Sequence, residues 1–484
     1  MQHGAPGPRV PRFDSSFCDP AARKGILGAA ILGSSMGFID GSVVAIAIPA
    51  IREGLGASLA EAQWINNAYM VALAALVLAG GAVGDRFGTA RMFAAGIGLF
   101  ILTSLACAMA PTPQALIWAR WAQGAGAALM VPGSLAVIAR AYPREVRARA
   151  IGYWAAASAV TTAMGPIIGG LVLTFGGTEV WRAIFAVNLP LGLVALWLIR
   201  RNVREDRPRP DRGIDLPGAA LATLGLGLVA WGFIRMEAGH GVGWRLGLGT
   251  AALAAFLWVE VRSPNPMVPL YLFRERVFSI ANGATFTLYF GLSAVVFFLP
   301  MLLISGWDLT EIEAVIALGP LSVAIALLSR PFGKLADRYG VGLLIGGGAL
   351  VVGLGYGWLA VAVQSQDYWS GVILPLCLAA VGMAMVVAPL SAAIMSSAAD
   401  DAGGTASGIN NAVSRVAGLM AVAVMGPVVA SAYRRAGGTL SYGDPSSAAA
   451  HAEAMTAAFS AVAWGSAGLA LVSGAIALVG LWRR

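Results

Sequence analysis

The first residue whose chemistry needs an explanation is Asp40. It lies in the stretch MGFIDGSVVAIAIP (36–49), which is apolar on both sides of the acid and has no basic residue within four positions. Ionisable residues inside a membrane are costly, usually face an internal cavity and take part in transport. Burial and nearby charge can tune such a carboxyl group to take up a proton and release it when a charged solute binds. We interpret Asp40 as a proton carrier; the alternative is a protonated acid hydrogen-bonded to a neighbouring helix.

A second ionisable residue, Arg120, lies in the apolar stretch LIWARWAQGAG. A guanidinium stays charged in proteins, so inside a membrane it needs an anion or a polar cavity. Asp40 is the plausible counter-charge, and we hypothesise that Arg120 tunes its protonation. The alternative is an arginine held only by backbone carbonyl groups.

Further polar residues within apolar stretches are candidates for the lining of a cavity. Asn67 and Tyr69 also fit an aromatic belt at the end of a membrane helix, and Arg415 could instead extend to the membrane surface. These candidates are Asn67, Tyr69, Gln123, Asn410, Asn411 and Arg415.

Several kinds of chemistry lack the residues they need. The three histidines lie outside the apolar stretches, and the three cysteines are scattered, so neither a metal site nor a Ser-His hydrolase is indicated. Neither lysine, Lys24 or Lys334, belongs to the phosphate-binding pattern G-x-x-x-x-G-K-S/T. We therefore expect no enzyme activity, no metal and no cofactor, and an ion gradient as the energy source.

The composition shows where these residues must lie. Of the 484 residues 58% are hydrophobic and 12% are charged, whereas a soluble protein carries roughly twice that share of charge. Apolar runs of about 20 residues, long enough to cross a bilayer as helices, recur along the chain. The chain is therefore predicted to be an all-α polytopic membrane protein, with the lipid bilayer rather than nucleic acid as its partner.

The apolar runs predict fourteen membrane spans. An even number places both termini on one side. The predicted spans are 25–50, 64–84, 92–110, 114–139, 150–174, 184–199, 216–235, 244–261, 279–304, 311–329, 341–363, 369–397, 405–430 and 456–481.

The basic residues predict the orientation of these spans. Most of the 32 Lys and Arg residues fall in the N-terminal tail, in loops after even-numbered spans and at the C-terminus. The positive-inside rule then places both termini in the cytoplasm. The densest block, RRNVREDRPRPDRG (200–213), is expected to be a linker that is extended rather than packed, because of its prolines and like charges.

A repeated loop divides the chain. GAVGDRFGTAR (81–91) after the second span recurs as GKLADRYGVG (333–342) after the tenth. Parallel repeats of this kind build transporters whose halves rock about a central site. The repeat predicts a tail at 1–24, a six-helix bundle at 25–200, a basic linker at 201–215, two inserted helices at 216–262 and a second bundle at 263–482.

The residue types in this loop have a physical logic. Gly81 permits close approach of helices, Asp85 can cap the next helix, Arg86 lies at the level of the lipid phosphates and Gly88 permits a tight turn. The equivalent residues of the second copy are Gly333, Asp337, Arg338 and Gly340. The alternative, an ordinary turn with an anchoring arginine, is weakened by the repetition.

The fifth predicted span contains TTAMGPIIGGL. Pro166 removes a helix hydrogen bond and kinks the span, whereas Gly165, Gly169 and Gly170 permit close contact with a neighbouring helix. The alternative is a structural kink unrelated to the direction of transport.

These motifs together resemble the major facilitator superfamily, and within it the fourteen-span drug:proton antiporter branch. The repeated loop resembles the family pattern G-x-L-A-D-R-x-G, although Val83 and Gly84 replace Leu and Ala in the first copy. FIDGSVVAIAIP resembles the branch's first-helix pattern L-D-x-T-V-V-N-V-A-L-P, with Ser42 in place of Thr. Similar agreement extends over QWINNAY, RWAQGAGAA, MGPIIGG, WRAIFAVNLPLG and GTASGINNAVSRVAG.

The resemblance implies two six-helix bundles plus two extra helices. It also implies proton coupling by Asp40 and Arg120, loops that latch one side, and a glycine-rich fifth helix typical of exporters. We expect a monomeric multidrug efflux transporter of the bacterial inner membrane that exports hydrophobic, cationic or amphiphilic compounds in exchange for protons. Alternatives are a dedicated exporter of one natural product, an importer and a non-transporting sensor.

Overall fold

The computed structural model describes residues 17–176, 178–204, 206, 208, 213–236, 242–397 and 403–481. All regular structure in these residues is helical. The first seven α-helices are α1 (Arg23–Leu55), α2 (Leu59–Phe87), α3 (Thr89–Ala108), α4 (Pro113–Ala141), α5 (Arg144–Gly176), α6 (Trp181–Ala186) and α7 (Asn188–Asn202).

A helical hairpin and a second group of helices follow. The hairpin consists of α8 (Leu216–Ile234) and α9 (Val242–Arg262). The second group consists of α10 (Arg276–Met301), α11 (Glu311–Tyr339), α12 (Val341–Ala362), α13 (Leu374–Ser396), α14 (Gly403–Arg435) and α15 (Ala449–Leu481), with single π-helical turns at Leu302–Gly306 and Trp369–Ile373.

The fourteen predicted spans correspond to these helices. Thirteen helical stretches of the described residues are long and apolar enough to cross a membrane, and α5 adds the shorter apolar segment Met164–Gly176. The sixth span is formed by two helices, α6 and α7, rather than one. Pro190 explains the break because it has no N–H to donate to the carbonyl of Ala186.

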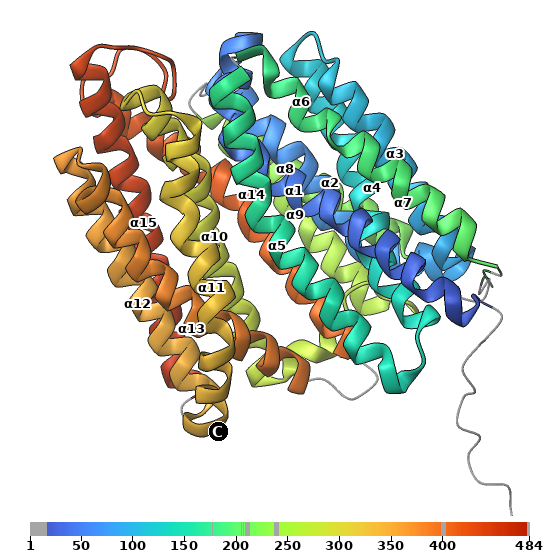
Figure 1. Cartoon of the computed structure of the whole chain (residues 1–484). Coiled ribbons are helices and arrows are strands. Elements are labelled where there is room, and N and C mark those ends of the chain that lie inside the picture. Colours follow the sequence, from blue (N-terminus) through green and yellow to red (C-terminus); the bar gives the residue numbers. More distant parts are fainter. Residues whose placement is uncertain are drawn as a thin grey trace, which may run out of the picture.

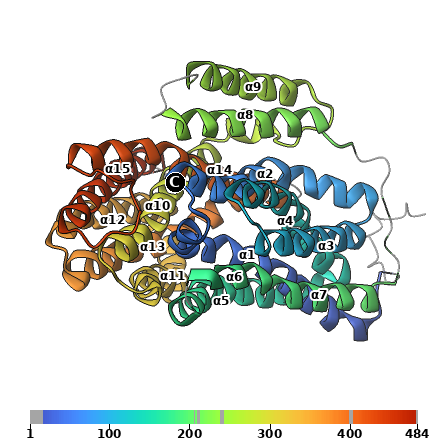
Figure 2. The ribbon, with the colours of Figure 1, turned by 90° about the horizontal axis from the view of Figure 1, so that it is seen from above.

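The helices form two groups with the hairpin at their edge. In Figure 1, α3, α4, α6 and α7 lie on one side of the molecule and α10, α12, α13 and α15 on the other, with α14 running between them beside α5. Within the first group α4 packs on α2 and α3, and α1 packs on α5 and α7; within the second, α12 packs on α13 and α15. Figure 2 shows α8 and α9 outside this arrangement, with α8 packed against α2 and α14.

Close packing of α2 on α4 depends on glycine. A Cβ atom at Gly124 would lie 2.4 Å from the carbonyl oxygen of Tyr69, and one at Gly80 would lie 2.1 Å from that of Ala128. Any side chain at either position would force these two backbones apart. The glycines therefore fix α4, and with it Arg120, close to α2.

The two repeated loops lie at helix turns that define one face of the molecule, here called the loop face. Gly88 joins α2 to α3 with φ +109°, and Gly340 joins α11 to α12 with φ +90°. L-residues other than glycine rarely adopt such values, so these two turns favour glycine. The other end of the bundle, which carries the α1–α2 and α14–α15 connections, is called the opposite face.

The two groups of helices meet at the opposite face. Gln63 of α2 donates a hydrogen bond to the carbonyl of Val422 in α14 (2.6 Å), and Thr174 of α5 donates to Glu311 of α11 (3.1 Å). Arg52, at the end of α1, reaches the α14–α15 connection. At the loop face, by contrast, α2, α4 and α14 line a cavity of about 670 Å³.

The N-terminal tail and the linker pack against the first group where they are described. Phe17 and Cys18 are fully buried, and Asp19 forms an ion pair with Arg204 of the linker. Asp206 forms an ion pair with Arg140 at the end of α4 (2.7 Å). The expectation of an unpacked linker is therefore wrong at these residues, whereas residues 1–16, 205, 207 and 209–212 lie outside the described part.

Candidate functional site

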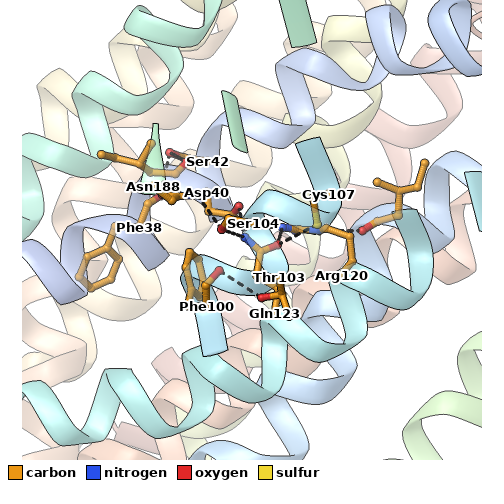
Figure 3. A network of polar contacts seen from close by, with 12 residues as sticks. Phe38, Asp40, Ser42, Phe100, Thr103, Ser104, Cys107, Arg120, Gln123 and Asn188 are labelled. Atoms are coloured by element: carbon orange, nitrogen blue, oxygen red, sulfur yellow. Dashed lines mark hydrogen bonds and ion pairs between the residues drawn. The ribbon is translucent and has the colours of Figure 1, made fainter. Parts of the chain in front are cut away.

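Asp40 and Arg120 form a buried ion pair, as the sequence hypothesis anticipates. Nη1 of Arg120 lies 2.5 Å from Oδ2 of Asp40, and each residue is 1% exposed. The pair joins the middle of α1 to the first half of α4 (Figure 3). Arg120 also donates to the carbonyl of Ile65 in α2 (3.1 Å), so three helices meet at this guanidinium.

Gln123 completes the coordination of the pair. Its side-chain oxygen accepts a hydrogen bond from Arg120 (2.6 Å), and its amide donates to Oδ1 of Asp40 (2.9 Å) and to Ser104 of α3 (2.9 Å). Asn188, at the start of α7, donates to the same serine hydroxyl (3.3 Å). Figure 3 shows these residues converging from α1, α3, α4 and α7.

Aromatic rings cover the guanidinium. The ring centroid of Tyr69 lies 4.3 Å from the Arg120 guanidinium carbon, and that of Phe185 lies 5.7 Å from it. Such contacts stabilise a desolvated cation. Together with the hydrogen bonds, they leave the ion pair shielded from water in this conformation.

Burial makes the pair interdependent. Desolvating two charges is costly, and mutual attraction offsets that cost only when both partners are present and hydrogen-bonded. Removing one partner leaves the other as an uncompensated buried charge, at a cost of roughly 3–5 kcal/mol. Because Asp40 is sealed here, a proton from water could reach it only after a rearrangement of α1 or α4.

A cavity of about 460 Å³ lies on the other side of α1, between the two groups of helices. Neighbours of Asp40, namely Phe38, Gly41 and Ser42, line it, whereas Asp40 itself points to the opposite side of the helix. Ser407 and Asn411 line both this cavity and the cavity of about 670 Å³ at the loop face, so the two spaces are neighbours along α14.

The cavity has a polar wall formed by α14. Asn410, Asn411 and Arg415 line it, and among its described lining residues Arg415 supplies the charge. Arg415 donates to the side chain of Asn411 (3.4 Å), and Asn410 donates to Thr285 of α10 (2.6 Å). A solute in the cavity would therefore meet amide groups and a guanidinium on this side.

The other candidate cavity residues lie elsewhere. Tyr69 and Gln123 are buried around Arg120, and Asn67 is fully buried, with no hydrogen-bond partner for its amide nitrogen among the described residues. Ser104 and Asn188, which sequence reasoning missed, belong to the ion-pair network. The signal for both was available, since each is a polar residue inside an otherwise apolar stretch.

The two loop copies have different surroundings. Gly81 and Asp85 line the cavity of about 670 Å³ at the loop face, across from α14. In the second copy Gly333 lies near Ala388 of α13, and the remaining members are at the end of α11, where the charged ones are exposed. The second-copy residues are Gly333, Asp337, Arg338 and Gly340.

A linker residue occupies the position at which a helix cap was expected. Asp206 accepts a hydrogen bond from the backbone N–H of Arg91 (2.8 Å) in the first turn of α3, while its other oxygen pairs with Arg140. A carboxylate there interacts favourably with the helix dipole. Asp85 and Arg86 lie one turn earlier, at the end of α2, and Asp85 faces the cavity.

The glycines of the fifth helix face both groups. A Cβ atom at Gly165 would lie 2.7 Å from Oγ of Ser42 in α1, and one at Gly169 would lie 2.1 Å from Val43. At Gly170 it would lie 2.8 Å from Val315 of α11. Pro166 lies inside the helix between these contacts. This surface of α5 is therefore packed against one helix of each group.

Comparison with known proteins agrees with this architecture. The family model for the Major Facilitator Superfamily matches residues 30–422. Solved structures with the same fold include a bacterial homolog of the human lysosomal transporter Spinster, in an inward-facing and unoccupied conformation, with a TM-score of 0.66, 17% identity, and coverage of 96% of this chain and 100% of that one. A D-xylose-proton symporter has a TM-score of 0.64, 16% identity, and coverage of 94% and 97%.

Relatives with higher identity carry names related to drug or antibiotic resistance. The multidrug resistance protein Stp of Mycobacterium tuberculosis is 32% identical over 83% of this chain and 74% of its own length. The methylenomycin A resistance protein of Streptomyces coelicolor is 30% identical over 82% and 84%. The tetracenomycin C resistance and export protein of Streptomyces glaucescens is 32% identical over 83% and 75%. The chain is a multi-pass integral membrane transporter, not an enzyme, and it belongs to the major facilitator superfamily.

Proposed function

We propose that this transporter exports hydrophobic or amphiphilic compounds across the bacterial inner membrane in exchange for protons. The observation that carries the proposal is the buried Asp40–Arg120 pair beside the central cavity. The drug and antibiotic resistance relatives support export. The loop face is assigned to the cytoplasm, with both termini on that side, because the basic residues gather there.

In the proposed cycle, cargo and proton bind at separate places: cargo in the central cavity and the proton at Asp40 of the ion pair. With the cavity open to the loop face, Asp40 is paired, sealed and charged, and cargo enters beside α14. When the molecule opens to the other side, rearrangement of α1 exposes Asp40 to a proton, and cargo leaves. Loss of that proton restores the pair with Arg120 and the state described here. The two loops, with Asp85 and Asp337, close the cytoplasmic side in the outward state.

The first test is proton-driven transport of a fluorescent dye in proteoliposomes. Asp40→Asn is expected to abolish the response to an imposed pH gradient, whereas Asp308→Asn, an exposed acid at the opposite face, serves as the matched control. Because Asp40→Asn leaves Arg120 charged and buried, the neutral double variant Asp40→Asn/Arg120→Gln is measured beside it. Gradient-driven efflux at the wild-type rate in either folded variant would refute the proposal.

A separate measurement tests the part proposed for Arg120. Arg120→Gln alone removes the charge while retaining a hydrogen-bonding side chain, so it should change the pH dependence of transport. Exchange of labelled cargo without a gradient reports whether the variant is folded and binds. An unchanged pH profile in a variant that still exchanges cargo would contradict the tuning role.

The charge of the cargo is a further question. The sequence predicts a hydrophobic cargo that is cationic or amphiphilic, whereas the described lining of the central cavity contributes Arg415 as its charged group. Competition among cationic, neutral and acidic dyes of similar size decides this point, because Arg415 should weaken binding of the cation. Preferential competition by the cationic dye would support the sequence expectation.

A second candidate function is the export of one natural product. Two of the relatives are named for resistance to single antibiotics, methylenomycin A and tetracenomycin C. A dedicated exporter should ignore most unrelated dyes, whereas a multidrug exporter should be inhibited by many of them. Inhibition of dye efflux by a panel of unrelated compounds separates the two functions.

A further inference from the structure

A third cavity lies outside the central passage, between α2, α4 and α8. It has a volume of about 860 Å³ and is lined by four of the fourteen tryptophans of the chain. One comes from α2, two from α4 and one from α8, and we call this space the tryptophan groove. The tryptophans are Trp64, Trp118, Trp121 and Trp231.

The groove faces the lipid, not the transport pathway. Trp118 is 72% exposed and Leu224 is 57% exposed, although both line it. Among the described residues, none lines both the groove and the central cavity. In a membrane a space of this kind would be filled by an amphiphile from the bilayer.

The polar end of the groove lies at the opposite face. Glu61 is in the first turn of α2, Gln114 is in the first turn of α4, and Arg235 follows the last residue of α8. The walls further along the same helices are apolar and include Ile117, Leu224 and Leu228. The groove is therefore charged at the depth of lipid headgroups and apolar at the depth of acyl chains.

The two charges at this end have opposite signs, and the acid is held in place. Glu61 accepts hydrogen bonds from the backbone N–H of Ser58 (2.9 Å), from its hydroxyl (2.8 Å) and from the amide of Gln114 (2.5 Å). Arg235 is exposed and close enough to act on Glu61 electrostatically. A ligand with only one charge would be attracted by one group and repelled by the other.

We propose that the tryptophan groove binds one phospholipid with a zwitterionic, amine-containing headgroup. Its ammonium would lie beside Glu61 and the tryptophan faces, which attract cations, and its phosphate beside Arg235. The acyl chains would fill the apolar walls between α4 and α8. Because α8 connects the hairpin to the bundle, such a lipid would strengthen the attachment of α8 and α9. This site goes beyond the proposed export function and does not depend on it.

Native mass spectrometry of the purified full chain tests this assignment. Phosphatidylethanolamine and phosphatidylglycerol are titrated separately at equal concentrations. The wild type should retain phosphatidylethanolamine at about tenfold lower concentration, a difference equivalent to one interaction of about 1.4 kcal/mol. Glu61→Gln should reduce this preference, because Glu61 faces the ammonium, whereas Arg235→Gln should weaken retention of both lipids, because both carry the phosphate. Glutamine is accepted at the third position of a capping box, so Glu61→Gln should preserve the start of α2.

A matched control separates the groove from a general effect of surface charge. Arg262, at the end of α9, lies over the ring of Trp258 with its guanidinium carbon 4.2 Å from the centroid, but it is outside the groove. Arg262→Gln makes the same charge change beside a tryptophan and should leave lipid retention unchanged. Equal retention of both lipids by the wild type, or equal effects of Arg235→Gln and Arg262→Gln, would overturn the proposal.

The same experiment distinguishes the lipid from transported cargo. Tetraphenylphosphonium, a lipophilic cation, is added in competition with phosphatidylethanolamine. It should displace the lipid poorly from the wild type because Arg235 opposes its charge. Efficient displacement that is lost in Glu61→Gln and strengthened in Arg235→Gln would overturn the lipid assignment and indicate a cation site.

Discussion

Arg52 connects the two groups of helices at the opposite face, and its removal should favour opening there. It is 4% exposed and donates hydrogen bonds to the carbonyl of Tyr442 (2.6 Å) and to Asp444 (2.5 Å), both in the α14–α15 connection. Tyr442 in turn donates to the carbonyl of Phe298 in α10 (3.0 Å). Burial raises the pKa of Tyr442 well above its ordinary value, so its hydroxyl remains protonated and able to donate.

The size of the effect follows from these contacts. A hydrogen bond to a charged group contributes about 1.5–3 kcal/mol, and the pair with Asp444 lies at the lower end because Asp444 is partly exposed. In the open state water would solvate the separated groups and recover part of this energy. A net loss of about 2 kcal/mol changes the ratio of the two conformations by roughly thirtyfold.

Distance measurements between spin labels on the two groups of helices can detect this change. Arg52→Gln should increase the population that is open at the opposite face. The matched control is Arg182→Gln, because Arg182 lies at the same face and donates to two backbone carbonyls, those of Ala108 and Ala110 (3.0 and 2.8 Å), within the first group only. If both variants give the same distance distribution as the wild type, the contacts of Arg52 do not hold this face closed.

Two further predictions concern single side chains. Gly165→Ala should lower stability by about 1–3 kcal/mol and impair transport, because the added Cβ would lie 3.1 Å from the backbone of Ile39 in α1. The control in thermal unfolding is Gly152→Ala, because a Cβ atom there meets nothing within 4 Å. Equal losses of stability in the two variants would contradict the argument. Glu260→Gln should leave thermal stability unchanged or raise it, because the carboxylate is poorly compensated where it lies. Glu260 is 3% exposed, one of its oxygens has no hydrogen-bond partner among the described residues, and Asp215 is a nearby like charge. A large loss of stability would show that the acid itself is needed.

The main features of the fold could be predicted from the sequence. Length and apolar composition determine the number of spans, and glycine at positive φ determines the two repeated turns. The pairing of Asp40 with Arg120 could also be anticipated, since two opposite charges in apolar helices have few other partners.

The direction of the Asp40 side chain could not be predicted. Successive residues of a helix point about 100° apart, so Asp40 and Gly41 face different neighbours. α1 is apolar around most of its circumference, with buried residues on all sides, and its sequence therefore carries no amphipathic signal to indicate which side meets the cavity. Only the packing of α1 against α4 determines that the acid meets Arg120 and the next residue meets the cavity.

Contacts between distant segments could not be predicted from the sequence either. Arg52 and Asp444 are 392 residues apart, and neither lies in a motif that indicates the other as its partner. Asp206 lies in a basic segment, where like charges favour an extended chain. Its position at the start of α3 depends on Arg140 and on the free N–H groups that any helix start provides.

The lengths of the helices can be compared with the thickness of the bilayer. α9 has 21 residues and would extend about 31 Å, close to the thickness of a hydrocarbon core of about 30 Å. Because α9 is only about as long as the core is thick, it must stand nearly upright to span it. α1, with 33 residues, would extend about 50 Å, so it must tilt or project into water at its ends. A thicker membrane would therefore strain the hairpin before it disturbed the longer helices of the bundle.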